Sequence, residues 1–142
     1  MPDILHRVGI SARPARVFDA LATRDGVRGW WVRDATGKAA KGGTIDFLFC
    51  KMKVVEAKPG SRVRWRCTRG PDEWIGTEVT FDLVWKDRQT FVLFKHAGWK
   101  EPIEFMHHCS TKWAVFLLSL REFVETGSGR PAPHDLKIHV GD

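Results

Sequence analysis

The sequence predicts an α+β domain in which a curved antiparallel sheet of about six strands wraps around one long C-terminal helix, with two short helices after the first strand. Residues 102–126 contain no internal Gly or Pro and repeat apolar residues at steps of three and four, which predicts an amphipathic helix. From residue 44 to residue 97 the repeat changes to two, with Gly- or Pro-bearing turns between the runs, which is typical of an antiparallel meander. The apolar face of such a sheet would bury the apolar stripe of the helix.

The N-terminal part predicts one strand and the two short helices. Residues 3–10 alternate as a strand, and residues 14–22 read as a helix with Pro14 in its first turn. A second short helix is expected over 25–31, followed by a polar, glycine-bearing loop over 34–43.

The five remaining strands are expected at 44–50, 51–58, 61–68, 73–85 and 89–97. In the strand at 73–85, alternation places Ile75 on the inner face and Trp74 at the rim or surface. The long helix should hold Pro102 in its first turn and end at Gly127. We therefore expect one domain over residues 1–126 and a tail over 127–142 that packs on its surface.

Composition restricts the class of protein. With 43% hydrophobic and 28% charged residues among 142, the chain reads as globular rather than disordered. No apolar run approaches the roughly 18 residues of a membrane helix, and the N-terminus lacks the pattern of a signal peptide. We expect a cytoplasmic protein whose cysteines, Cys50, Cys67 and Cys109, are free and buried.

The net charge of +6 raises nucleic acid as a partner. Arg62, Arg64 and Arg66 share the outer face of one expected strand, and Glu78 and Asp82 lie on the polar face of the next. The two sets are therefore expected to pair across the sheet. The aromatic residue among the arginines should point inward, whereas single-strand binding needs exposed aromatic residues. The pattern argues against nucleic acid.

His96 is the residue best suited to donate a hydrogen bond or a proton to a ligand. Alternation places it on the face of Val92 and Phe94, where it could contact a ligand inside a cavity. The alternative, which we favour, is that it anchors the turn into the helix by bonding a backbone carbonyl.

His107, His108 and Cys109 are adjacent on the helix, where successive side chains point about 100° apart, so they cannot form a metal site alone. His96 or Cys67 could complete one, but no ligand-spacing motif is present. We expect no metal, no cofactor and no catalytic residue.

The seven Trp and nine Phe residues exceed what a domain of this size needs merely to fold. They either interdigitate into a solid core or surround an apolar cavity, and the sequence leaves both readings open. The residues expected to line such a cavity are Trp30, Trp31, Phe47, Phe49, Trp65, Phe81, Phe94, His96, Cys109, Trp113 and Phe116.

Several segments resemble one superfamily in their order and spacing. They are the run Ala15–Leu21, the pair Trp30 and Trp31, the run Trp74–Phe81, the run Lys95–Trp99, and Trp113, Leu117, Leu120, Glu125 and Gly127. Residues 3–126 as a whole resemble the SRPBCC superfamily, which has the START-like helix-grip fold. Within it the chain looks most like the family related to the activator of the heat-shock chaperone ATPase, a resemblance that suggests a stress-response role. It also implies a deep apolar cavity between sheet and helix, but no single activity, because relatives include lipid binders, cyclases and chaperone cofactors.

These observations give one preferred hypothesis and two alternatives. We expect binding of a small hydrophobic or aromatic molecule between the sheet and the long helix, without catalysis. One alternative is a cyclase- or hydrolase-type enzyme that uses cavity water and His96. The other is a chaperone-cofactor-like module that binds a protein partner through the arginine stripe and the tail after Gly127. Homodimerisation stays open.

Overall fold

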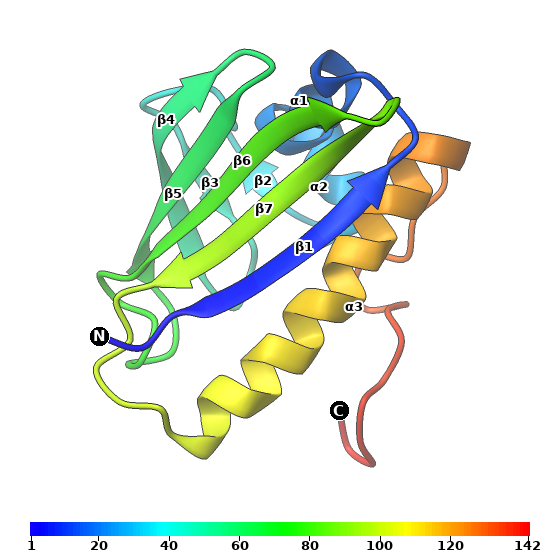
Figure 1. Ribbon diagram of the computed structural model, residues 1–142. Helices are drawn as coiled ribbons and strands as arrows, with labels where there is room; N and C mark the ends of the chain where they lie inside the picture. Colours follow the sequence, from blue (N-terminus) through cyan, green and yellow to red (C-terminus); the bar gives the residue numbers. More distant parts are fainter.

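The computed structural model describes all residues, 1–142, and contains one seven-stranded sheet and three helices (Figure 1). The elements are β1 (Ile4–Ile10), α1 (Pro14–Ala22), α2 (Arg24–Trp30), β2 (Thr36–Gly37), β3 (Thr44–Asp46), β4 (Lys51–Lys58), β5 (Arg62–Arg69), β6 (Glu78–Lys86), β7 (Gln89–Ala97) and α3 (Glu104–Thr126). The strand order is β1-β7-β6-β5-β4-β3-β2, and every neighbouring pair is antiparallel. The predicted α+β helix-grip fold is confirmed, with β2 from the expected loop as the additional strand.

The helix ends follow their capping residues. Thr23 accepts a hydrogen bond from the backbone N–H of Gly26 at 3.0 Å, so α2 begins one residue earlier than expected. Gly127 has φ of 87° and ends α3 as predicted, because glycine adopts this left-handed conformation without strain. The expectation for Pro102 is wrong: Ile103 caps α3, so the proline precedes the helix rather than occupying its first turn.

The start of β6 also differs from the prediction. The chain turns through residues 71–76, where the N–H of Trp74 bonds the carbonyl of Pro71 at 2.9 Å and Gly76 has φ of 83°. Because the segment is not extended, alternation does not apply to it. Ile75, expected inside, is 53% exposed, whereas Trp74, expected at the rim or surface, is only 5% exposed.

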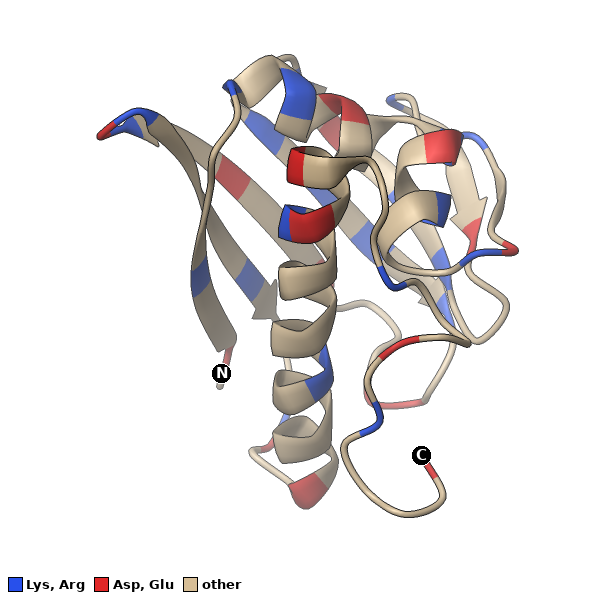
Figure 2. Ribbon diagram, turned by 90° about the vertical axis from the view of Figure 1, so that its right-hand side faces the viewer, with Lys and Arg blue, Asp and Glu red and all other residues tan.

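The core lies between the inner face of the sheet and α3, which runs across that face (Figure 2). Trp31 stacks on Trp65 with ring centroids 5.7 Å apart and planes 3° from parallel. α2 is fixed at one end of this core by the indole N–H of Trp30, which donates to the carbonyl of Ala20 at 2.9 Å. The three cysteines are free and buried, as predicted. No helix combines the length and the hydropathy that crossing a bilayer would require.

The outer face of the sheet carries a ladder of ion pairs. Arg62 contacts Asp82 at 2.5 Å, and Arg66 contacts Glu78 at 2.8 Å. Arg64 lies between Glu78, at 3.3 Å, and Glu56 of β4, at 3.5 Å. The arginines therefore pair with acidic residues on both neighbouring strands, and solvent screens these exposed pairs, so they contribute little to stability.

Two adjacent leucines of α3 test how the helix is held. Leu117 is 2% exposed in the core, and Leu118 is 47% exposed on the outer side. Leu117→Ala should lower the free energy of unfolding by about 2–5 kcal/mol because it leaves a cavity. Leu118→Ala should change it by less than about 0.5 kcal/mol. Urea denaturation measures both, and equal effects would contradict the packing described.

Candidate ligand-binding pocket

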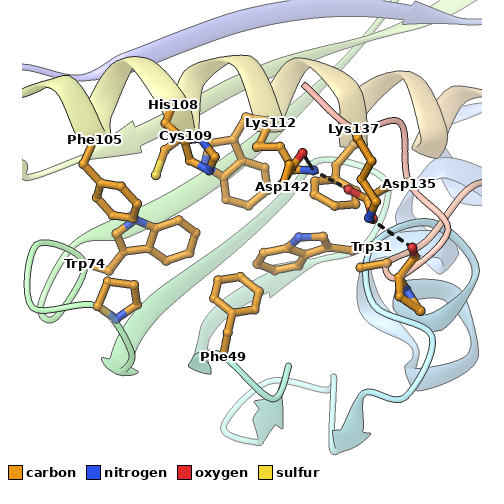
Figure 3. Close-up of a pocket in the computed structure, with 15 residues that line it drawn as sticks. Trp31, Phe49, Trp74, Phe105, His108, Cys109, Lys112, Asp135, Lys137 and Asp142 are labelled. Atoms are coloured by element: carbon orange, nitrogen blue, oxygen red, sulfur yellow. Dashed lines mark hydrogen bonds and ion pairs between the residues drawn. The ribbon is translucent and has the colours of Figure 1, made fainter. Parts of the chain in front are cut away.

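A cavity of about 450 Å³ opens between the N-terminal half of α3, the turn at 71–74, and the C-terminal tail (Figure 3). Its wall is largely aromatic on one side and charged on the other. The residues that line it are Trp31, Phe49, Pro71, Trp74, Phe105, His108, Cys109, Lys112, Trp113, Phe116, Ala132, Pro133, Asp135, Lys137 and Asp142. A volume in this range suits a small organic molecule.

Three tryptophans form the apolar wall. The ring of Trp113 lies 4.8 Å from that of Trp31 and 6.0 Å from that of Trp74, which it faces within 13° of parallel. Phe49 meets both Trp31 and Trp74 edge-on, at 5.8 and 5.5 Å. Edge-on and offset contacts of this kind are the favoured aromatic geometries, so the wall is well packed.

A buried chain of hydrogen bonds joins the indole of Trp113 to the backbone carbonyl of Trp74. The indole N–H of Trp113 can only donate, and it does so to Nδ1 of His96 at 3.1 Å. The proton of His96 must then lie on Nε2, which donates to the hydroxyl of Thr77 at 2.8 Å. That hydroxyl donates in turn to the carbonyl of Trp74 at 2.5 Å. His96 therefore positions the pocket wall from behind.

His96 is not exposed to the pocket. Its accessible surface is 0%, and both ring nitrogens are hydrogen-bonded. Burial lowers the pKa of His96 to about 3, so the ring is neutral at physiological pH. It bonds side chains of α3 and of the turn before β6, and it reaches a backbone carbonyl only through Thr77. This differs from the direct carbonyl bond that the sequence suggested.

The residues expected to line a cavity divide into two groups. The structure places Trp31, Phe49, Cys109, Trp113 and Phe116 on the pocket wall. The other six do not line this pocket and lie buried in the packed core: Trp30, Phe47, Trp65, Phe81, Phe94 and His96. Alternation correctly indicated that Trp65, Phe81, Phe94 and His96 point inward. It could not indicate that aromatic packing fills the space where they point.

A charged rim faces the aromatic wall and was not predicted. Lys112 of α3 pairs with Asp135, and its Nζ lies 2.9 Å from Oδ2 of Asp142. Lys137 approaches the other oxygen of Asp135 at 2.9 Å. Burial favours a raised pKa for Asp135, but the hydrogen bonds from Lys112 and Lys137 outweigh it, so the net pKa is lowered. The hydrogen bond from Lys112 is also the main reason that the pKa of Asp142 falls to about 2. Both carboxylates are thus ionised.

The tail after Gly127 supplies this rim. The backbone of Ala132 bonds the carbonyl of Trp31 at 2.7 Å and the N–H of Arg33 at 3.0 Å. The side chain of Asp135 is only 3% exposed, and its ion pair with Lys112 attaches the tail to α3. Beyond packing on the surface, the tail forms one side of the pocket and runs beside α3 (Figure 2). Glycines, prolines and scattered charges give no periodic signal that could have indicated this.

The buried His96 predicts an acid sensitivity. The unfolded chain binds a proton at His96 near pH 6.5, whereas the folded protein resists protonation until about pH 3. As pH falls from 6.5, stability should therefore drop by up to about 1.4 kcal/mol per pH unit from this residue. Urea unfolding between pH 5 and 7.5 should show a smaller pH slope in His96→Gln than in the wild type. The exposed control His107→Gln should keep the wild-type slope, and an unchanged slope in His96→Gln would refute the assignment.

Comparisons with known proteins identify the family that has this architecture. The profile of the family described as activator of Hsp90 ATPase homolog 1-like protein matches residues 11–125. The chain is similar to the solution structure of the Aha1 dimer from Colwellia psychrerythraea, with 44% sequence identity and a TM-score of 0.83. The match covers 91% of this chain and 100% of that chain. Two further structures share the fold. CalU16 from Micromonospora echinospora is 19% identical with a TM-score of 0.75, and the match covers 92% of this chain and 77% of that chain. SSP2350 from Staphylococcus saprophyticus is 15% identical with a TM-score of 0.75, and the match covers 92% of this chain and 98% of that chain. A comparison with curated proteins found no match. The family match covers most of the domain, so the chain belongs to the activator of Hsp90 ATPase homolog 1-like family, within the SRPBCC superfamily.

Proposed function

We propose that this protein binds a small hydrophobic molecule with a flat or ring-containing body in the pocket beneath α3. The observation that carries the proposal is a cavity of about 450 Å³ lined by aromatic side chains, of which Phe49 is 49% exposed and Trp31, Trp74 and Trp113 lie behind it. Aromatic faces bury a flat ligand over a large area, at roughly 25 cal/mol per Å² of apolar surface. The family and its fold are consistent with hydrophobic-ligand binding.

The charged rim would orient the bound molecule. Lys112, Lys137, Asp135 and Asp142 lie together on one side of the pocket, away from Trp74 and Phe49 (Figure 3). A few polar groups against an apolar wall is the usual composition of a site that binds by burial and selects by hydrogen bonding. The proposed ligand therefore has an apolar body and one polar end.

The geometry favours binding over the enzymatic alternative. His96, the base that this alternative required, lies behind the wall with both nitrogens occupied. Burial is the main cause that raises the pKa of the Cys109 thiol to about 11, so this pocket residue stays protonated and is a poor nucleophile. The lysines of the rim are paired with carboxylates. None of these groups supports a turnover mechanism.

A second candidate function is interaction with another copy of the chain. Leu5, Leu93 and Val84 are 65%, 43% and 42% exposed, and they lie on the outer face of the neighbouring strands β1, β7 and β6. The 44% identical structure from Colwellia psychrerythraea is described as a dimer. Lys95 is the cross-strand neighbour of Leu5, and Arg7 and Asp82 are those of Leu93, so this surface combines exposed apolar side chains with charged ones.

Phe49 tests the binding proposal because it lines the pocket and is 49% exposed, so its removal should spare the fold. The probe is 8-anilinonaphthalene-1-sulfonate, which has an aromatic body and one anionic end. Phe49→Ala should weaken its binding about tenfold, equivalent to about 1.4 kcal/mol of lost contact. Leu93→Ala removes an equally exposed apolar side chain outside the pocket and should leave binding unchanged. Native mass spectrometry of protein from its own host would then identify the natural ligand.

The pocket would be refuted as the site if the wild type did not bind the probe, or if Phe49→Ala bound it as tightly as the wild type does. A wild-type response from Leu93→Ala is needed to assign the effect to the pocket rather than to exposed apolar surface in general.

The interaction candidate predicts a dimer that a charge disrupts. Leu93→Asp should shift the mass measured by light scattering from dimer toward monomer, because it places a carboxylate in the apolar contact. Leu118→Asp, on the outer side of α3, is the matched control and should not change the mass. A monomeric wild-type protein would rule this candidate out.

A further inference from the structure

Three potential metal ligands converge beside the pocket from two distant segments. His108 of α3, and His139 and Asp142 of the tail, each present one ligand atom, and these atoms lie within 4.8 Å of one another. His108 and Asp142 also line the pocket, so this cluster borders its charged rim (Figure 3). His107, the neighbour of His108, is exposed and lies outside the cluster.

The hydrogen bonds of the tail prepare two of these groups. Nδ1 of His139 lies 2.8 Å from the carbonyl of Val140, which can only accept, so the proton is on Nδ1 and the lone pair is on Nε2. A backbone carbonyl bonded to the other ring nitrogen is the usual partner of a metal-binding histidine. Oδ2 of Asp142 accepts from Lys112 and from the N–H of Ile138, both at 2.9 Å, which leaves Oδ1 for a cation.

We propose that His108, His139 and Asp142 bind a divalent transition-metal ion of the Zn²⁺ type. Two imidazoles and one carboxylate form a donor set that suits Zn²⁺, Co²⁺ or Ni²⁺ better than Mg²⁺ or Ca²⁺. Metal–ligand bonds of about 2.0–2.2 Å require the three atoms to draw together slightly. The exposure of His139 permits that movement.

The surrounding charges are compatible with a bound cation. Lys112 pairs with both Asp135 and Asp142, and Lys137 pairs with Asp135. The two ammonium groups and two carboxylates sum to zero, so the rim carries no net positive charge that would repel a cation. Three protein ligands leave a tetrahedral ion one open position. Because the cluster borders the pocket, an oxygen or nitrogen atom of a bound molecule could take that position.

The metal would also tie the end of the tail to α3. His139 and Asp142 belong to the tail and His108 to the helix, so one ion bridges them. Residues 137 and 138, which precede these ligands, should then become less accessible to a protease. This gives a readout that depends neither on a pocket ligand nor on any activity.

Titration calorimetry of the full chain with ZnCl₂ tests the site directly. The wild type and the control His107→Ala should bind one ion per chain. His139→Ala and Asp142→Asn should bind at least about tenfold more weakly, since each removes one of three ligands. Zinc should slow tryptic cleavage after Lys137 in the wild type and in His107→Ala but not in His139→Ala.

Two results would overturn the proposal: an absence of zinc binding by the wild type, or equal binding by the wild type and His139→Ala. The second result would assign the zinc to adventitious surface histidines. The probe-binding experiment on Phe49 uses no metal, so the pocket proposal and the metal proposal can fail separately.

Discussion

The hydrogen-bond chain from Trp113 through His96 and Thr77 to Trp74 is the constraint on which the pocket depends. Each of its polar groups is buried, and a buried group without a partner costs about 1–3 kcal/mol. The chain satisfies them in sequence and joins α3, β7 and the turn before β6 at one point. It therefore fixes the indole of Trp113 through its N–H and the backbone of the turn at Trp74 through its carbonyl.

The charged rim adds a second constraint, which comes from the other end of the chain. Asp135 is nearly inaccessible, so its charge is stable only because Lys112 and Lys137 both reach it. That requirement holds the tail against α3 and gives the pocket a polar side. The proposed metal site lies along the same contact, and it would couple the position of the tail to the occupancy of the pocket.

One part of the interior is tightly packed, and another part contains the cavity. Around Trp65, Phe81 and Phe94 the aromatic side chains interlock and leave no room for a ligand. Near the N-terminal half of α3 the turn at 71–74 and the tail replace the sheet as the opposing surface, and the cavity lies there. Local alternation reports which way a side chain points. It carries no information on whether the opposing element is close enough to fill the gap.

The sequence by itself determined the elements and their partners: the period of α3, its end at Gly127, the alternation of β5 and β7, and the inward side of Trp31 and Trp113. These features follow from local geometry and from the need to bury one face of each element. Only the tertiary structure decided that Trp74 is buried, that His96 lies behind the wall, and that Lys112, Asp135, Lys137 and Asp142 meet at one rim. The reason is physical: these contacts join residues far apart in the chain, through turns and a tail that have no periodicity.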